Sequence, residues 1–264
     1  MSSDDDALLV EQDGGVLTLT NVDPPRNRMT FAYMNALEEA VNRAATDPSV
    51  RAIVFTAAGD EHFSVGMDLK QLVSAGNEHG AFDEILDQRR RVLGMIESME
   101  KPSIATLFGY CLGGGLELPL ACHFRLAADH GARIGLPELD LGTVPAWGGT
   151  ARLTRTVGRA NALDMMLRVR KIDGMQALDI GLVHEVHPMD ELKSAARALA
   201  EELAALPPVA VAGVLRCVVG AGDAPLEEAL DIEREAVNAC NGTEDLIEGM
   251  QAFMQKRKPV FRGR

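Results

Sequence analysis

The chain has 264 residues, of which 47% are hydrophobic and 25% are charged, and its formal net charge is −13 at pH 7. This composition is that of a soluble globular protein, and no apolar run approaches the ~20 residues that a membrane-spanning helix needs. The negative charge repels phosphate backbones and anionic lipid surfaces, so we expect neither nucleic acid nor a membrane as a partner.

The beginning of the chain, MSSDDD, lacks the basic and apolar regions of a secretory signal and the arginine-rich character of a transit peptide. We therefore predict a cytoplasmic protein. The four cysteines form no C-x-x-C pair, which argues against a disulfide framework or a zinc site. Only two of the six histidines, His184 and His187, lie close together, so we expect no metal.

The first 60 residues alternate between strand and helix signals. Residues 8–21 predict two strands around a turn at 13–15, and Thr30 is a suitable N-cap for a helix to about residue 46. A β-branched run at 51–59 then predicts a buried strand. This alternation indicates an α/β fold.

A helix is predicted over residues 81–99, where apolar residues recur with a period of 3.6. The stripe comprises Phe82, Ile85, Leu86, Val92, Leu93, Ile96 and Met99. Arg89, Arg90 and Arg91 interrupt it, and we interpret them as a solvated or ion-paired turn.

The stretch from 104 to 153 carries the strongest chemical signal. Three glycines at 113–115 follow an apolar run, and Glu117 lies two residues beyond them. Glycines there leave the first amides of a helix open to a substrate carbonyl, and such an amide can stabilise an oxyanion. The turn at Gly66 and Met67 is the candidate for a second donor, and tight helix–sheet packing is the alternative explanation for the glycines.

A second glutamate, Glu138, lies in a Pro-Glu-Leu turn before a loop that reaches Trp147. We expect Glu117 to stay ionised at its helix N-terminus and the pKa of Glu138 to be raised by burial. Two carboxylates in different environments suit general acid and base catalysis. A surface or capping role is the alternative for either residue.

The rest of the chain is predicted to be mostly helical. The expected helices cover 149–156, 159–168, 174–180, 189–206, 209–220, a segment from about 224 with Asp223 as its cap, and 243–256, with one strand at 182–187. This indicates an α/β core followed by an α-helical C-terminal subdomain.

The segments IATLFGYCLGGGLELPLACH and GLPELDLGTVPAWGGTARL resemble the signature region of the crotonase (enoyl-CoA hydratase/isomerase) superfamily. HFSVGMDLK, KIDGMQALDIGLVHEV and EGMQAFMQKRKPVF resemble further family segments in the same order. The resemblance implies a crotonase-type ββα spiral core over 1–200 and an α-helical trimerisation subdomain over 201–264. It also implies a homotrimer or a dimer of trimers.

The resemblance assigns roles to residues of this sequence. The amides of Met67 and Gly114 would bind the thioester oxygen, Glu117 would activate water, and Glu138 would deliver a proton to the α-carbon.

Binding of the acyl-CoA substrate is assigned in the same way. Asp68, Leu69 and Lys70 would lie along the CoA arm, although Asp68 would chiefly hold the turn. The basic residues Lys256 and Lys258 would lie near the CoA phosphates, often those of a neighbouring subunit. Ala146 replaces a frequent glycine of the family and, together with Trp147, would narrow or reshape the acyl pocket; the alternative for Trp147 is a loop aromatic packed on the core.

Because both glutamates are present, the resemblance favours an enoyl-CoA hydratase whose substrate is a coenzyme A thioester and which needs no other cofactor. Alternatives are a Δ3-Δ2 isomerase, a hydroxyacyl-CoA dehydratase or an acyl-CoA hydrolase. A non-catalytic or RNA-binding homologue is a remote alternative, since no lysine-rich helix face is present. His123 replaces a usual aspartate, and we interpret it as a hydrogen-bonded structural residue, with a pH-sensitive substrate contact as the alternative.

Overall fold

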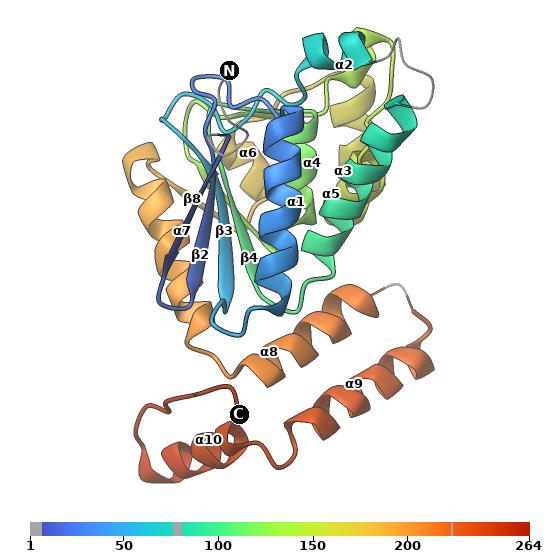
Figure 1. The fold of residues 1–264 in the computed structure, drawn as a ribbon. Helices are drawn as coiled ribbons and strands as arrows, with labels where there is room; N and C mark the ends of the chain where they lie inside the picture. Colours follow the sequence, from blue (N-terminus) through green and yellow to red (C-terminus); the bar gives the residue numbers. More distant parts are fainter. Residues whose placement is uncertain (1–6, 76–80, 223) are drawn as a thin grey trace.

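A computed structural model describes residues 7–75, 81–222 and 224–264 (Figure 1). Six strands form the main sheet in the order β1-β2-β3-β4-β6-β8, in which only β1 is antiparallel to its neighbour. These strands are β1 (Leu8–Asp13), β2 (Val16–Asn21), β3 (Ala52–Ala57), β4 (Ser103–Leu107), β6 (Phe124–Ala128) and β8 (Glu185–His187). All six residues of β3 are buried, as the β-branched run predicts for a central parallel strand.

A second, two-stranded parallel sheet pairs β5 (Tyr110–Leu112) with β7 (Arg133–Gly135). Ser64 forms an isolated β-bridge with Cys111 in β5, and Met67 forms another with Met29. The segment around residue 64 is therefore held beside β5, although nearly 50 residues separate the two in sequence. This small sheet positions the loops that carry the predicted site.

The helices cover both faces of the main sheet and continue beyond it. They are α1 (Phe31–Thr46), α2 (Leu69–Ala75), α3 (Ala81–Glu97), α4 (Gly114–Ala121), the 3-10 helix η2 (Glu138–Leu141), α5 (Gly149–Leu167), α6 (Gly174–Asp179), α7 (Met189–Ala204), α8 (Pro208–Leu215), the π-helical turn η3 (Arg216–Gly220), α9 (Leu226–Cys240) and α10 (Glu244–Gln255). α7 packs against β3, β4 and β6, whereas α1 contacts β1, β2 and α3 (Figure 1).

The predicted α/β core and helical C-terminal region are confirmed. Thr30 caps α1 by accepting a hydrogen bond from the Tyr33 amide, and Thr243 caps α10 in the same way. The two helices expected at 149–156 and 159–168 are halves of α5, divided at Gly158, whose φ is 76°. α9 begins at Leu226 after Pro225, and the expected cap Asp223 lies outside the described residues.

The interpretation of α3 was wrong at two positions. Phe82 is 45% exposed, whereas Arg89 is only 1% exposed. Arg89 lies four residues from both Ile85 and Leu93, so the helical period places it on the inward face despite its charge. Of the other two arginines, Arg90 is exposed and Arg91 forms an ion pair of 2.7 Å with Glu38.

The last three helices, α8 to α10, extend away from the lower end of the core (Figure 1). They expose a series of large apolar side chains: Val214, Leu226, Leu230, Val237, Ile247, Met250, Phe253 and Met254. Within the described ranges no single helix is long and apolar enough to cross a membrane. The two segments Met189–Ala204 and Pro208–Gly220 would together be long and apolar enough, but the chain bends by 108° between them.

Candidate active site

The N-terminus of α4 is the centre of the candidate site. Gly113 has φ +56° and connects β5 to the helix, and its amide donates to the carbonyl of Gly135 at 3.1 Å. Gly114 is the first helical residue, so its own amide has no partner inside the helix. A Cβ on Gly114 would lie 2.2 Å from Cζ3 of Trp147, and only glycine allows the indole ring to approach this closely.

The turn at Gly66 and Met67 adjoins that helix terminus. Gly66 has φ +89°, and a Cβ there would lie 2.7 Å from the Leu112 carbonyl oxygen and 3.4 Å from the Gly114 amide nitrogen. The Gly66 amide donates to Oγ of Ser64 at 3.0 Å, which orients the turn. Neither Met67 nor Gly114 donates its amide to a backbone or side-chain acceptor among the described residues. Two unpaired amide groups are thereby brought together.

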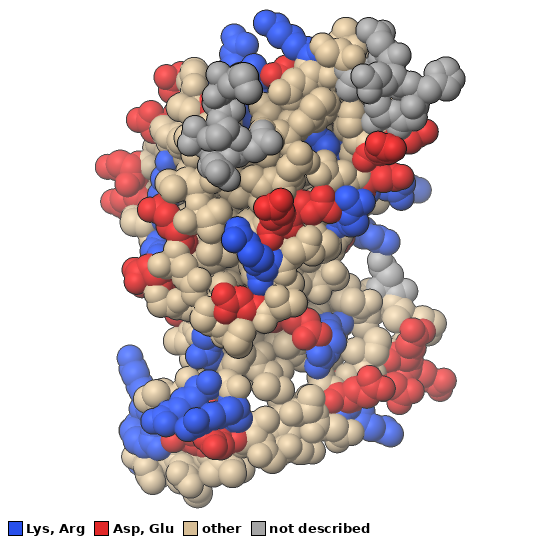
Figure 2. Space-filling view, viewed as in Figure 1, with Lys and Arg blue, Asp and Glu red and all other residues tan. Residues whose placement is uncertain are grey.

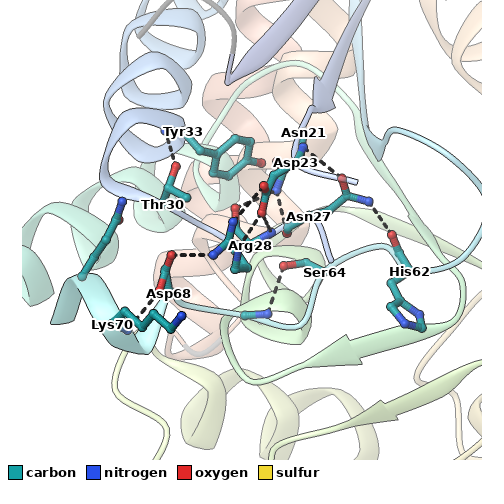
Figure 3. A network of polar contacts seen from close by, with 12 residues as sticks. Asn21, Asp23, Asn27, Arg28, Thr30, Tyr33, His62, Ser64, Asp68 and Lys70 are labelled. Carbon is teal, nitrogen blue, oxygen red and sulfur yellow. Dashed lines mark hydrogen bonds and ion pairs between the residues drawn. The ribbon is translucent and has the colours of Figure 1, made fainter. Parts of the chain in front are cut away.

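A network of ion pairs fixes this turn from outside (Figure 3). Nη1 of Arg28 donates to Asp68 at 2.9 Å, and the Lys70 amide donates to the other oxygen of Asp68 at 3.0 Å. Arg28 also holds Asp23 through Nε at 2.7 Å and Nη2 at 3.0 Å. Burial alone would raise the pKa of Asp23, but the bonds and charge of Arg28 lower it below its usual value. The carboxylate of Asp68 is therefore engaged by the protein itself.

Glu117 projects from the first turn of α4 and is 2% exposed. Its Oε1 accepts hydrogen bonds from the amides of Trp147 and Gly149, both at 2.8 Å. Burial raises the pKa of Glu117 to about 7, and the nearby charge of Glu138 contributes to this rise. The two amides and Arg152 act in the opposite direction and lower the pKa, but their effect is smaller. Desolvation outweighs the local hydrogen bonds, so the helix terminus does not keep the pKa of Glu117 low, and the carboxylate is only partly ionised near neutral pH.

Glu138 begins the 3-10 helix η2 and faces the glycine turn. A Cβ on Gly113 would lie 2.8 Å from Oε1 of Glu138, which shows how closely the carboxylate approaches the backbone. Its Oε2 is buried and accepts no hydrogen bond among the described residues. Burial raises the pKa of Glu138, in the direction that the sequence predicts. The two glutamates thus lie near the two free amides, and burial raises the pKa of both.

The loop before α5, whose Trp147 amide donates to Glu117, is held in place by Arg152. Trp147 is buried, and Arg152 donates to its carbonyl oxygen at 3.0 Å. Arg152 also forms an ion pair of 2.6 Å with Glu97 at the end of α3. Ala146, beside Trp147, is exposed. Sequence reasoning did not single out Arg152 or Arg28, since nothing in the local sequence pattern reveals partners 40 or more residues away.

The remaining predicted residues lie at the edges of the site or away from it. Leu69 and Lys70 are exposed at the start of α2, next to the Met67 turn. Lys256 and Lys258 follow α10, which lies apart from α4 (Figure 1). His123 is hydrogen-bonded to Ser103, whose amide donates to Nδ1 at 3.1 Å, as expected for a structural residue.

Metal ligands are not grouped in the described ranges: no cluster of three or more His, Cys, Asp or Glu side chains is placed to hold an ion. The groups that the structure brings together at the site are two amides and two carboxylates. Such a site can stabilise an oxyanion and move protons on either side of it.

Comparison with known proteins agrees with this chemistry. A "Probable enoyl-CoA hydratase" of Bacillus subtilis is 38% identical over 97% of this chain and 98% of its own length. The 2,3-dehydroadipyl-CoA hydratase of Escherichia coli is 36% identical over 97% of this chain and 99% of its own length. A crystal structure of an enoyl-CoA hydratase from Bacillus anthracis matches with a TM-score of 0.92 and 32% identity, covering 98% of this chain and all 100% of that one.

A sequence profile described as enoyl-CoA hydratase/isomerase matches residues 11–264, almost the whole chain. Together with the structural match, this confirms the crotonase-type α/β fold that the sequence motifs predict. The chain belongs to the enoyl-CoA hydratase/isomerase family.

Proposed function

We propose that this enzyme is an enoyl-CoA hydratase, which adds water reversibly across the C2=C3 bond of an α,β-unsaturated acyl-CoA. The observation that carries the proposal is the position of two carboxylates, Glu117 in the first turn of α4 and Glu138 against Gly113, beside the free amides of Gly114 and of the adjoining Met67 turn. Relatives 36–38% identical to the chain are named as hydratases, which supports the same reaction class.

In the proposed reaction, the thioester oxygen accepts hydrogen bonds from the amides of Met67 and Gly114. Ionised Glu117 takes a proton from water as the water oxygen bonds to C3, and the electrons of the double bond move towards the thioester oxygen. Protonated Glu138 gives its proton to C2 and completes the hydroxyacyl-CoA. Each oxyanion donor is worth about 3–4 kcal/mol of transition-state stabilisation.

The raised pKa values of the two glutamates suit this division of roles. Burial raises the pKa of both carboxylates, and the charge of Glu138 raises the pKa of Glu117 further. The reaction then needs one charged and one neutral carboxylate, which is the state that their mutual repulsion favours. The coenzyme A thioester is the substrate, and the proposed steps use no further cofactor.

The CoA arm is proposed to lie along residues 67–70, with Leu69 and Lys70 at the surface. Basic side chains gather at the end of the molecule that carries α10 (Figure 2). Because that end lies away from α4 within one chain, we assign Lys256 and Lys258 to the CoA phosphates of a neighbouring subunit. This assignment requires more than one subunit, and we propose a homotrimer or a dimer of trimers. Location in the cytoplasm stays a prediction.

An apolar groove supports such an assembly. It has a volume of about 400 Å³, and its lining includes Val209, Leu246, Met250, Phe253 and Phe261. Phe253 is 87% exposed in the single chain, an unusual position for a phenylalanine unless another subunit covers it.

Phe253→Asp is expected to convert the wild-type oligomer to a monomer, because it places a charge in the apolar face of α10. Molar mass measured by light scattering after gel filtration checks this. Gln251→Asp adds the same charge at an exposed position of the same helix that does not line the groove, and it should keep the wild-type mass. Equal masses for wild type and Phe253→Asp would contradict the proposed interface.

The proposed activity is tested by following the loss of the enoyl thioester absorbance of crotonyl-CoA and by identifying the product. Formation of 3-hydroxybutyryl-CoA is the expected result. A folded protein that hydrates neither crotonyl-CoA nor longer or carboxylated enoyl-CoAs would refute hydratase function. Conversion of a 3-enoyl-CoA without hydration would indicate the isomerase reaction instead.

A further inference from the structure

Arg89 on α3 is a buried cation with incomplete hydrogen bonding. It is 1% exposed, and its Nη1 donates to Oε1 of Gln88. Nε and Nη2 are also buried, yet neither has an acceptor among the described residues. Burial lowers the pKa of Arg89 to about 10, so the side chain still carries its charge at neutral pH. Charged groups are rarely buried without a partner, so Arg89 is an unusual residue in this fold.

No carboxylate of the described residues pairs with this guanidinium directly. The charge of Glu38 acts on it, but the Glu38 oxygens are taken by Arg91 at 2.7 Å and by Nε2 of Gln88 at 2.9 Å. Gln88 therefore links Arg89 to Glu38 only indirectly. Gln88 thus orients one side of the guanidinium, and the two nitrogens on its other side, Nε and Nη2, have no acceptor among the described residues.

The two unpaired nitrogens form one edge of the guanidinium group. Nε–H and the adjacent Nη2–H of arginine point in nearly parallel directions, which matches the two oxygens of a carboxylate. A bidentate partner of this kind would satisfy both donors at once. Cation–π contacts do not do this, since they use the face of the group and leave the edge donors unpaired.

The surroundings connect Arg89 to the candidate active site. Its Cζ lies 5.9 Å from the centre of the Trp147 ring and 5.3 Å from that of Phe31. An edge of the same indole covers Gly114, and the Trp147 amide donates to Glu117. The guanidinium is thus separated from the proposed thioester site by one indole ring.

We propose that Arg89 binds a carboxylate at the far end of the substrate's acyl chain, which makes enoyl-CoA thioesters of dicarboxylic acids the preferred substrate class. This inference rests on the proposed function for the position of the thioester. An extended six-carbon chain places its last carbon about 6 Å from the thioester carbon, at about 1.2 Å per bond. The Trp147 ring centre alone lies 5.9 Å from Cζ of Arg89, and the proposed thioester site lies beyond that ring, so the acyl chain must have at least six carbons, and a six-carbon diacid is the shortest chain to test.

The test compares two saturated ligands that no hydratase consumes. Adipyl-CoA and hexanoyl-CoA both have six acyl carbons, but the acyl chain ends in a carboxylate in adipyl-CoA and in a methyl group in hexanoyl-CoA. Calorimetry on the wild type is expected to show adipyl-CoA binding roughly tenfold or more tightly. Arg89→Met should remove this preference. Arg90→Met, which changes the exposed neighbouring arginine, is the matched control and should keep it.

Arg89→Lys is a second variant, which retains the charge without the two-donor edge, and it should reduce the preference without reversing it. Equal affinity of the wild type for the two ligands would overturn the inference. So would an equal loss of both affinities in Arg89→Met, since that result would make Arg89 a support for the Trp147 loop. Because these are binding measurements, a preference for adipyl-CoA in a protein that hydrates no enoyl-CoA would refute the proposed function alone.

Discussion

Glu117→Gln is expected to lower kcat/KM for the hydration of crotonyl-CoA by about 10²–10⁴-fold, the usual contribution of a general base. The amide has nearly the same shape as the carboxylate, and its oxygen can still accept from the Trp147 and Gly149 amides. It cannot take a proton from water, so the loss should fall mainly on kcat. Initial rates from the decay of enoyl thioester absorbance measure both constants.

Glu39→Gln is the matched control, because Glu39 is exposed on α1 and its substitution removes the same charge away from the site. Its rate should equal that of the wild type. Hydration by Glu117→Gln at the wild-type rate would contradict the proposed role of Glu117. If isomerisation of a 3-enoyl-CoA survives in this variant while hydration is lost, Glu138 alone suffices for proton transfer at the α-carbon.

Much of the fold follows from local sequence signals, because the residues that give these signals themselves stabilise the helices, strands and turns in which they lie. Thr30 and Thr243 cap their helices as expected, since a hydroxyl oxygen two or three residues before a free amide needs no tertiary context. The glycines at 113–115 and Gly66 stand out in the sequence for a different reason. Their backbone conformations and close approaches admit no larger residue, so the sequence marks these positions.

Other features depend on contacts that local patterns do not encode. Arg89 occupies an inward position of α3, but sequence rules assign charged residues to the surface, and Trp147 comes from a loop 58 residues later. The ion pair between Arg28 and Asp68 likewise joins segments 40 residues apart. Such partners can be identified only when the chain is folded.

The pKa of Glu117 is the clearest case of tertiary structure reversing a local rule. A helix N-terminus and two amide donors favour the ionised form, and sequence reasoning followed them. Burial against the Trp147 loop favours the neutral form instead, and it is the larger effect, since the pKa rises from 4.5 to about 7. A buried carboxylate of this kind lowers the stability of the fold while serving the reaction.

This shift predicts a pH-dependent cost in stability. Because the folded state holds its proton up to about pH 7 and the unfolded state releases it near 4.5, the folded state binds more protons between these values. Stability therefore falls as pH rises through this window. A difference of about 2.5 pKa units corresponds to roughly 3 kcal/mol at 1.36 kcal/mol per unit, fully present above about pH 7 and absent below about pH 4.5.

Glu117→Gln removes the titration, so the variant is expected to be about 3 kcal/mol more stable than the wild type near pH 8 and equally stable near pH 4. Urea unfolding at the two pH values measures this, at one fixed protein concentration because assembly contributes to apparent stability. Glu39→Gln should show no such difference at either pH. A Glu117→Gln variant that is equally stable, or less stable, at the higher pH would show that the amide contacts of the carboxylate outweigh its desolvation. Combined with the expected loss of hydration, a gain in stability would identify Glu117 as a group retained for chemistry at the expense of the fold.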